Sequence, residues 1–355
     1  MFSNNIMSFI MLNIYLLLIV NMIMLSVIFI SISKDKLETY RYSEVYKSLK
    51  PLVLRYIKNG DNLRRVKTKS RGKYKFKILL DMMLEYAKDN NVEIIDRFER
   101  LECVDYLIKK GKRGVDLDII KAFSIIKSPK AYEILMCWTS SEDFEEKYMS
   151  FYALSLLKLE EERIETVIDK LINSSVVRDR QIEIINNFNL SIDKYINLLE
   201  VQKTEFGKVV LLRVIKSKIE IVQEQYSERI VKYLDMEKEI KIAAVLTIAS
   251  SMNEKYLPIL VKTYQCEDQW EIRAAVAKAL INFKSENILE LLKTMIYDEA
   301  WWVRTNALET LEQLGTEGIH ILVDLSLDTA NEKVASLAYN ILNSNKNIYE
   351  TAKSY

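Results

Sequence analysis

The segment EIRAAVAKALINF, residues 271–283, has the residue spacing of a helix that buries one face. Three other segments in the last third of the chain share this spacing: EIKIAAVLTIASSM (239–252), WVRTNALETLEQLG (302–315) and KVASLAYNILNS (333–344). An apolar residue near the start of each segment aligns them in steps of 32, 31 and 31 residues: Ile240, Ile272, Val303 and Val334. A period in this range is typical of helical-repeat proteins.

Each aligned segment places small and aliphatic residues on one helix face. A small residue follows the aligned position by three or four residues, and an aliphatic residue stands at the eighth. This stripe buries one face against neighbouring units, and alanine in its middle lets helices approach closely. The small residues are Ala244, Ala275, Ala307 and Ala338, and the aliphatic ones are Ile248, Leu280, Leu311 and Leu342.

A weaker form of the pattern extends upstream. It continues through Leu117, Met149, Val177 and Val209 at intervals of 32, 28, 32 and 31 residues up to Ile240. The fit is poor at Val209, because Arg213 and Ser217 stand where a small and an aliphatic residue are expected. We therefore expect about eight helix pairs, four of them well defined by sequence.

Composition and length favour the same fold. The chain has 355 residues, only three prolines and seven glycines, which favours helices joined by short turns over sheets. It also exceeds the roughly 250 to 300 residues at which a single core stops growing. The sequence therefore predicts an all-α fold with a core that grows by repetition.

The second helices resemble those of HEAT repeats, which typically read as an apolar residue, arginine, two further residues, alanine and then leucine. This pattern is carried by Ile272, Arg273 and Leu280 in one unit and by Val303, Arg304, Ala307 and Leu311 in the next, which closes on Gly315. The resemblance implies a right-handed α-solenoid of HEAT-type helix pairs.

The resemblance also implies a ladder in which an aspartate of each turn pairs with the arginine of a second helix. Asp235, Asp268 and Asp298 lie four or five residues before the aligned positions. Lys241 replaces arginine in one unit, and Ala335 removes the charge in the last. We interpret Arg273 and Arg304 first as ladder residues and second as candidate partner-binding residues.

Tryptophans recur at one place in successive units. Trp270 and Trp301 each stand two residues before the aligned position, and Trp302 lies beside the second. We interpret Trp270 and Trp301 first as residues that pack across the turn between repeats, and Trp302 as the better candidate for exposure, because adjacent helical residues cannot face one way. As exposed residues, the three would form a partner-binding edge.

An uncharged, apolar run at residues 6–32 predicts a single transmembrane helix. Its 27 positions would form a helix of about 40 Å, more than the roughly 30 Å of hydrocarbon. A cleaved signal peptide is the alternative, but the run lacks a basic start and a clear small-residue cleavage site. Because the basic residues crowd its C-terminal side, the rest of the chain is expected in the cytoplasm.

A basic neck follows the apolar run. Residues 34–77 contain 15 Lys and Arg against 4 Asp and Glu, so they carry +11 while the rest of the chain carries −10. Residues 34–60 are expected to form an amphipathic helix or two, broken at Pro51. Basic residues then alternate with other types, which suits a strand, a hairpin or a flexible arm: Lys67, Lys69, Arg71, Lys73, Lys75 and Lys77. This stretch is either a solvated linker or a surface that attracts anionic lipid headgroups.

No pattern of catalytic, cofactor-binding or metal-binding residues occurs in the chain. His320 is the only histidine, and the three cysteines form no CxxC pair and suit buried thiols of a reducing compartment. We therefore expect no catalytic residue, cofactor or metal. Two alternatives stay open: a HEAT-like enzyme such as a bilin lyase, and a nucleic-acid-binding repeat protein, which the net −10 of the body disfavours.

The layout of anchor, basic neck and terminal units resembles a bacterial group of membrane-anchored HEAT-repeat proteins. Members often occur beside membrane glycosyltransferases, which implies a scaffold or adaptor for such an enzyme or for a polysaccharide-export component. The expected parts are a transmembrane helix (6–32), the neck (34–77), a helical lead-in (78–112), the solenoid (113–345) and a tail (346–355).

Overall fold

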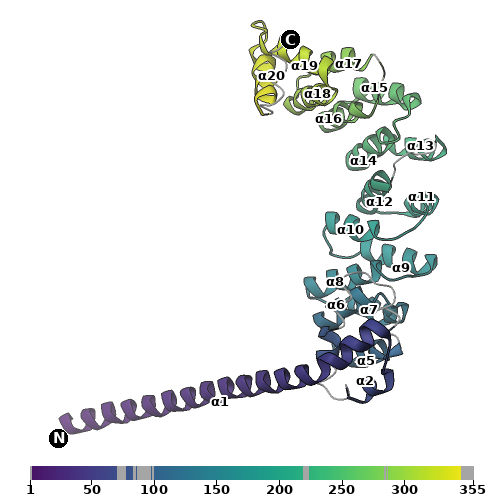
Figure 1. The fold of residues 1–355 in the computed structure, drawn as a ribbon. Coiled ribbons are helices and arrows are strands. Elements are labelled where there is room, and N and C mark those ends of the chain that lie inside the picture. The colour runs from purple at the N-terminus through teal and green to yellow at the C-terminus, as the bar shows by residue number, and fades with distance from the viewer. Residues whose placement is uncertain are drawn as a thin grey trace. The chain divides into compact units, whose positions relative to one another are not determined.

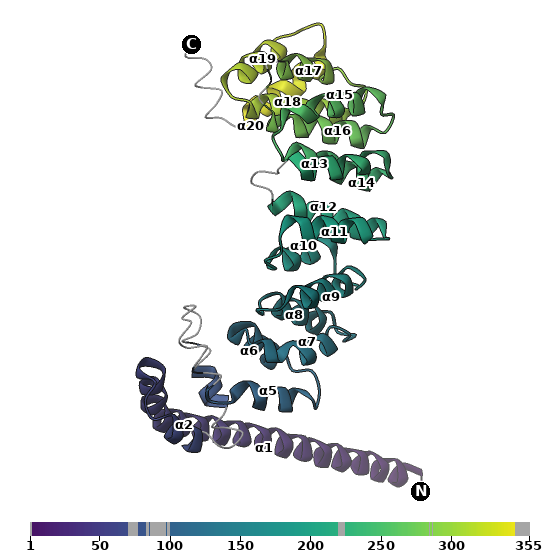
Figure 2. The ribbon, with the colours of Figure 1, turned by 90° about the vertical axis from the view of Figure 1, so that its right-hand side faces the viewer.

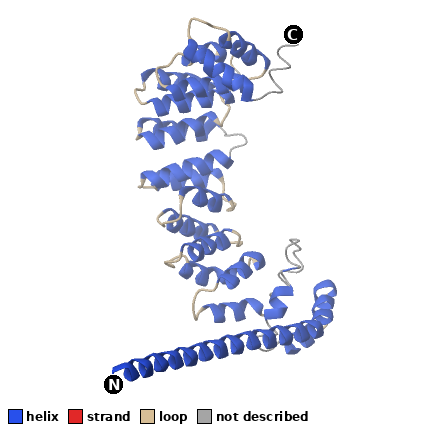
Figure 3. Cartoon of the chain, turned by 90° about the vertical axis from the view of Figure 1, so that its left-hand side faces the viewer, coloured by secondary structure: helices blue, strands red, loops and turns tan. Residues whose placement is uncertain are grey.

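The computed structural model describes residues 2–69, 77–82, 85, 97, 100–218, 224–283, 285 and 287–344, with side chains from Met22 onward except at residues 27, 28, 35, 67–69, 224, 225 and 344. The regular elements within these ranges are all helices, and no strand occurs there (Figure 3). The predicted all-α class is therefore confirmed for the described residues. The chain divides into two compact units, Met1–Lys158 and Leu159–Tyr355.

The first unit begins with one long helix, α1 (Phe2–Asn59). The predicted break at Pro51 is wrong, because Pro51 lies inside this helix. A proline there removes one backbone hydrogen bond, but apolar packing holds the helix on both sides of it: Leu49, Val53 and Tyr56 are all buried. The helix that carries the apolar run therefore continues without interruption into the core of the first unit.

Shorter helices complete the first unit (Figure 2). α6 packs against α8, and α7 packs against α8. Residues 63–69 are helical rather than extended, which corrects the expected backbone at Lys67 and Lys69. The elements are α2 (Leu63–Lys69), α5 (Cys103–Gly111), α6 (Leu117–Ile126), η1 (Pro129–Ala131), α7 (Tyr132–Trp138) and α8 (Phe144–Ser155).

The second unit is built of consecutive helix pairs. Figure 1 shows the first helices α9, α11, α13 and α15 on one side and the second helices α10, α12, α14 and α16 on the other. The elements are α9 (Glu161–Ile172), α10 (Arg178–Asn186), α11 (Ile192–Val201), α12 (Glu205–Lys218), α13 (Glu224–Val231), η2 (Lys232–Asp235), α14 (Lys238–Ala249), η3 (Glu254–Tyr256), α15 (Leu257–Cys266), α16 (Trp270–Ala279), η4 (Leu280–Asn282), α17 (Ile288–Met295), α18 (Trp301–Gln313), α19 (Thr316–Ser326) and α20 (Glu332–Ser344).

The four well-defined repeats have the predicted register. Each aligned apolar residue is the third residue of its second helix and is buried: Ile240, Ile272, Val303 and Val334. The small residues and the aliphatic residues of the predicted stripe are buried as well. Successive second helices α12, α14, α16 and α18 pack directly against one another, as the alanines in the middle of the stripe predict.

The register predicted for α12 is wrong by two residues. The Thr310 hydroxyl of α18 donates to the Ala277 carbonyl of α16, and the Thr247 hydroxyl of α14 donates in the same way to the Leu212 carbonyl of α12. The second bond makes Gly207, not Val209, the equivalent of Ile240. Residues four and eight positions after Gly207 are then Leu211 and Ile215, and both are buried.

Apolar side chains of α1 are exposed before it enters the core. Met22, Leu25, Phe29 and Ile30 each expose between 63% and 72% of their surface. Among the helices whose side chains are described, none qualifies as a membrane span. The side chains of residues 6–21, 27 and 28 of the predicted span lie outside the described part of the chain.

Ion pairs connect successive first helices of the second unit. Lys194 of α11 pairs with Glu161 of α9 at 3.2 Å. Arg229 of α13 pairs with Glu200 of α11 at 2.6 Å, and Lys232 of η2 pairs with the same carboxylate at 2.8 Å. Hydrogen bonds from Arg229 and then from Lys232 lower the pKa of Glu200 to about 2.

We predict that Glu200→Gln removes stability that depends on pH. Because the pKa of Glu200 is lowered in the folded state, its contribution is fully present above about pH 4.5 and is lost as pH falls to about 2. After solvent screening of this surface group, we expect a loss of about 1 kcal/mol at neutral pH. Thermal melting of wild type and variant at pH 6 and near pH 2 measures this loss of stability.

The control is Glu309→Gln, which alters an exposed carboxylate in the middle of α18 and should lower the melting temperature at pH 6 less than Glu200→Gln does. A cost of Glu200→Gln that is the same at both pH values contradicts the ion-pair assignment.

Candidate functional site

Three tryptophans form an exposed edge in the second unit. Trp270 is the first residue of α16, and Trp301 is the first residue of α18. Trp270, Trp301 and Trp302 expose 40%, 45% and 53% of their surfaces. More than half of the surface of Trp270 and of Trp301 is covered, so these values are compatible both with packing across the turn and with a partly exposed edge.

Trp301 and Trp302 also contact each other. Their ring centroids lie 4.5 Å apart in an edge-to-face arrangement, which is a favourable geometry for aromatic pairs. Tyr297 exposes 54% of its surface just after α17. The sequence analysis missed Tyr297, although its place one residue before the turn aspartate Asp298 is a usable signal. We call Trp270, Tyr297, Trp301 and Trp302 the aromatic edge.

Arg273 holds the turn between α17 and α18. The Arg273 Nε and Nη2 atoms each donate to a carboxylate oxygen of Asp298, at 2.9 Å. Its Nη1 atom donates to the carbonyls of Glu267 and Asp268. Because only 10% of the Arg273 side chain and 6% of the Asp298 side chain are exposed, this pair is a structural link. Arg273 is thus not placed to contact a partner.

Arg304 forms only part of the equivalent link. Its Nη1 atom donates to the carbonyls of Asp298 and Glu299. Its Nε atom is buried, with no hydrogen-bond partner among the described residues. In the preceding unit Lys241 pairs with Glu267 at 2.8 Å, so Glu267 takes the place that the sequence assigned to Asp268. The described ladder contains one full arginine–aspartate pair.

The electrostatics of the turn favour a charged Asp298. Burial alone would raise the pKa of the Asp298 carboxyl, but hydrogen bonds from Arg273 and from the Ala300 amide outweigh burial and lower it. The Tyr264 hydroxyl also donates to Asp298, and burial is the main cause that raises the pKa of Tyr264 to about 12. Asp298 thereby connects the turn to Tyr264 of α15 and to Arg273 of α16.

The alternating basic residues at the end of the neck lie mostly outside the described part of the chain. Lys77 is described and exposed. The side chains of Lys67 and Lys69 and the whole of Arg71, Lys73 and Lys75 lie outside the described part of the chain. Their assignment as a candidate membrane surface therefore stays a prediction.

The cysteine prediction is partly wrong. Cys103 is buried, whereas Cys137 and Cys266 are exposed. His320 is exposed as well. Within the described ranges, no three His, Cys, Asp or Glu side chains gather in a group that could hold a metal ion.

Comparison with known families assigns the C-terminal third of the chain. The pattern of HEAT repeats matches residues 227–311 and again residues 266–343. These matches fall on the four well-defined units, which are therefore similar to HEAT repeats. No curated protein matches the chain.

We predict that Arg273→Met destabilises the second unit. The substitution leaves the Asp298 carboxylate almost fully buried without its cation, which costs about 3 kcal/mol. Urea unfolding followed by circular dichroism measures the shift.

The matched variant Arg304→Met should cost less, because among the described residues Arg304 donates to carbonyl groups and not to a carboxylate. The double variant Arg273→Met with Asp298→Asn should cost less than the sum of the single variants. If the double variant loses as much free energy of unfolding as the two single variants together, Arg273 and Asp298 do not act as a pair in this turn.

Proposed function

We propose that the protein is a membrane-anchored scaffold that binds a protein partner through the aromatic edge of its HEAT repeats. The observation that carries this proposal is the exposure of four large aromatic side chains on adjoining helix ends and turns. Tryptophan and tyrosine are the residues most enriched at the energetic centres of protein interfaces. HEAT repeats themselves favour a role in protein interaction, because stacked repeats present extended binding surfaces.

The buried turn supports binding by the aromatic edge. Arg273 and Asp298 fix the backbone that carries Tyr297 and leads into Trp301. An interface residue on fixed backbone loses little conformational freedom when a partner binds. The edge is thus better suited to recognition than an aromatic side chain on a mobile loop.

The anchor is supported by the sequence and by α1. Residues 6–32 contain no charged side chain, and the described part of this run exposes its apolar side chains. An exposed apolar surface of this kind marks a site of contact with a membrane or with another protein. The basic residues that follow favour a single span with the repeats in the cytoplasm, and they would attract anionic headgroups.

The class of partner follows from the location and the resemblance. Confinement at a membrane raises the effective concentration of partners that reside there. The resemblance to membrane-anchored HEAT proteins favours a membrane glycosyltransferase or a polysaccharide-export component.

We predict that the full-length protein stays in the membrane after extraction with alkaline carbonate, because a spanning helix leaves the bilayer only with detergent. Immunoblotting of pellet and supernatant measures the distribution. A variant with Leu17→Lys and Ile19→Lys should be released, since each central lysine costs about 3 kcal/mol. Release of the wild type contradicts the anchor.

We predict that replacing Trp301 and Trp302 by serine weakens partner binding at least about thirtyfold, which corresponds to 2 kcal/mol or more for a central aromatic pair. Cross-linking in native membranes followed by mass spectrometry identifies and quantifies the attached protein.

The control is Tyr339→Ser, which removes an exposed aromatic side chain from α20. Equal retention of the partner by all three proteins contradicts the aromatic edge. Recovery of nucleic acid instead of protein contradicts the scaffold.

A further inference from the structure

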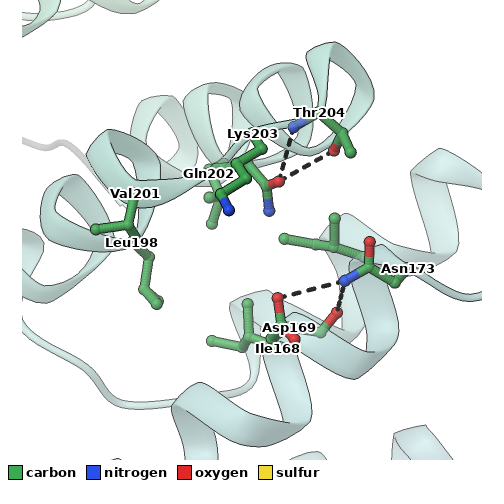
Figure 4. Close-up of a pocket in the computed structure, with 10 residues that line it drawn as sticks. Ile168, Asp169, Asn173, Leu198, Val201, Gln202, Lys203 and Thr204 are labelled. Carbon is green, nitrogen blue, oxygen red and sulfur yellow. Dashed lines mark hydrogen bonds between the residues drawn. The ribbon is translucent and has the colours of Figure 1, made fainter.

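A second candidate contact is a cavity of about 360 Å³ between α9, α11 and the start of α12. Its walls are mainly aliphatic and its rim is polar (Figure 4). The aliphatic residues come from three helices: Ile168, Ile172, Leu198, Val201 and Leu211. Cavities from about 300 Å³ upward with apolar walls and a few polar groups are typical of binding sites.

One side of the rim presents a fixed hydrogen-bond donor. The Gln202 Oε1 atom accepts from the Thr204 amide at 3.0 Å and from the Thr204 hydroxyl at 3.1 Å. The same hydroxyl accepts from the Gly207 amide, so its single proton goes to Gln202. These bonds identify the oxygen of the Gln202 amide and leave its Nε2 group to donate elsewhere.

Gly207 makes this arrangement sterically feasible. A Cβ atom at position 207 would lie 2.6 Å from Gln202 Cδ and 2.7 Å from its Nε2. Any other residue would therefore displace the Gln202 side chain from its place against the start of α12. The glycine that begins the apolar stripe of α12 also keeps the donor in position.

The other side of the rim presents a fixed acceptor. The Asn173 Nδ2 atom donates to the Asp169 carbonyl at 2.9 Å and to the Asp169 carboxylate at 3.3 Å. Because a carbonyl oxygen can only accept, these bonds identify the nitrogen of the Asn173 amide and leave its Oδ1 atom as an acceptor. Figure 4 shows Asp169 and Asn173 across the cavity from Gln202 and Thr204.

The charges of the rim favour an uncharged ligand group. Asp169 and Lys203 both line the cavity, so their charges balance. Neither sign of ligand charge is therefore favoured over the other. A peptide unit supplies one acceptor and one donor without charge, and it carries a side chain for the aliphatic wall.

We infer that this cavity binds an extended segment of the protein partner, with an aliphatic side chain against the walls, a backbone carbonyl on Gln202 Nε2 and a backbone amide on Asn173 Oδ1. The inference rests on the proposed scaffold function, since it adds a contact to the same partner. Val201 exposes 71% of its surface at the cavity, so a bound segment would cover an apolar residue that solvent now contacts.

A library of random heptapeptides displayed on phage tests this inference against the full-length protein in detergent. We expect enriched peptides to share one Leu, Ile, Val or Met position. Gln202→Glu keeps the acceptor for Thr204 but replaces the donor, so it should weaken binding of these peptides at least about tenfold, or roughly 1.4 kcal/mol. Val201→Glu and Gly207→Ala should weaken binding to a similar degree.

Matched controls are Gln313→Glu and Val177→Glu, which alter exposed residues of the same types elsewhere in the second unit. Both should bind the peptides as the wild type does, and circular dichroism should show all variants folded. Peptides that bind the Gln202→Glu and Val201→Glu variants normally contradict the cavity as their site.

The outcomes separate this inference from the scaffold function. If enriched peptides depend on Trp301 and Trp302 instead, the cavity inference is wrong while the scaffold function stands. If no peptide is enriched, or if the enriched peptides share only charged residues, the cavity inference is wrong, and cross-linking of the aromatic-edge variants decides the scaffold function on its own.

Discussion

Close contact between successive second helices is the constraint on which the second unit depends. Alanines at the middle of the stripe, such as Ala244 and Ala307, are fully buried and let the backbones approach. The approach is close enough that Thr310 reaches a carbonyl of the neighbouring helix at 3.0 Å. This contact fixes the height of α18 on α16, and so it also fixes where the tryptophans at the starts of these two helices emerge.

The C-terminal repeats could be predicted because each position of the stripe recurs with the same kind of side chain. A branched aliphatic residue begins the stripe, an alanine follows in the middle, and an aliphatic residue ends it. The prediction failed in α12, because glycine at position 207 replaces the branched residue that begins the stripe in the other units. Val209, two residues later, was taken for that residue. Glycine satisfies a different demand there, since it makes room for Gln202. A pattern of apolar residues cannot predict such a steric requirement. The hydrogen bond from Thr247 to the Leu212 carbonyl identifies the register of α12.

The candidate sites were predictable to different degrees. The tryptophans and Arg273 stand out by type and spacing, but their exposure depends on what the preceding turn covers, which the sequence does not contain. The donor of Gln202 and the acceptor of Asn173 were not predictable at all. Each amide is oriented by a neighbour within four residues, yet the two meet across one cavity only because α9 and α11 belong to adjacent pairs.

The continuity of α1 changes what the anchor can do. A flexible linker would let the first unit sample many heights above a bilayer, whereas α1 enters the core through Leu49, Val53 and Tyr56. From residue 33 to Leu49 the helix rises about 24 Å. If residues 6–32 span a membrane, this helical segment sets the distance between the bilayer and the first unit. A partner must then present its contact surface at that distance from the bilayer. This requirement limits which membrane proteins can bind, independently of the side chains at the interface.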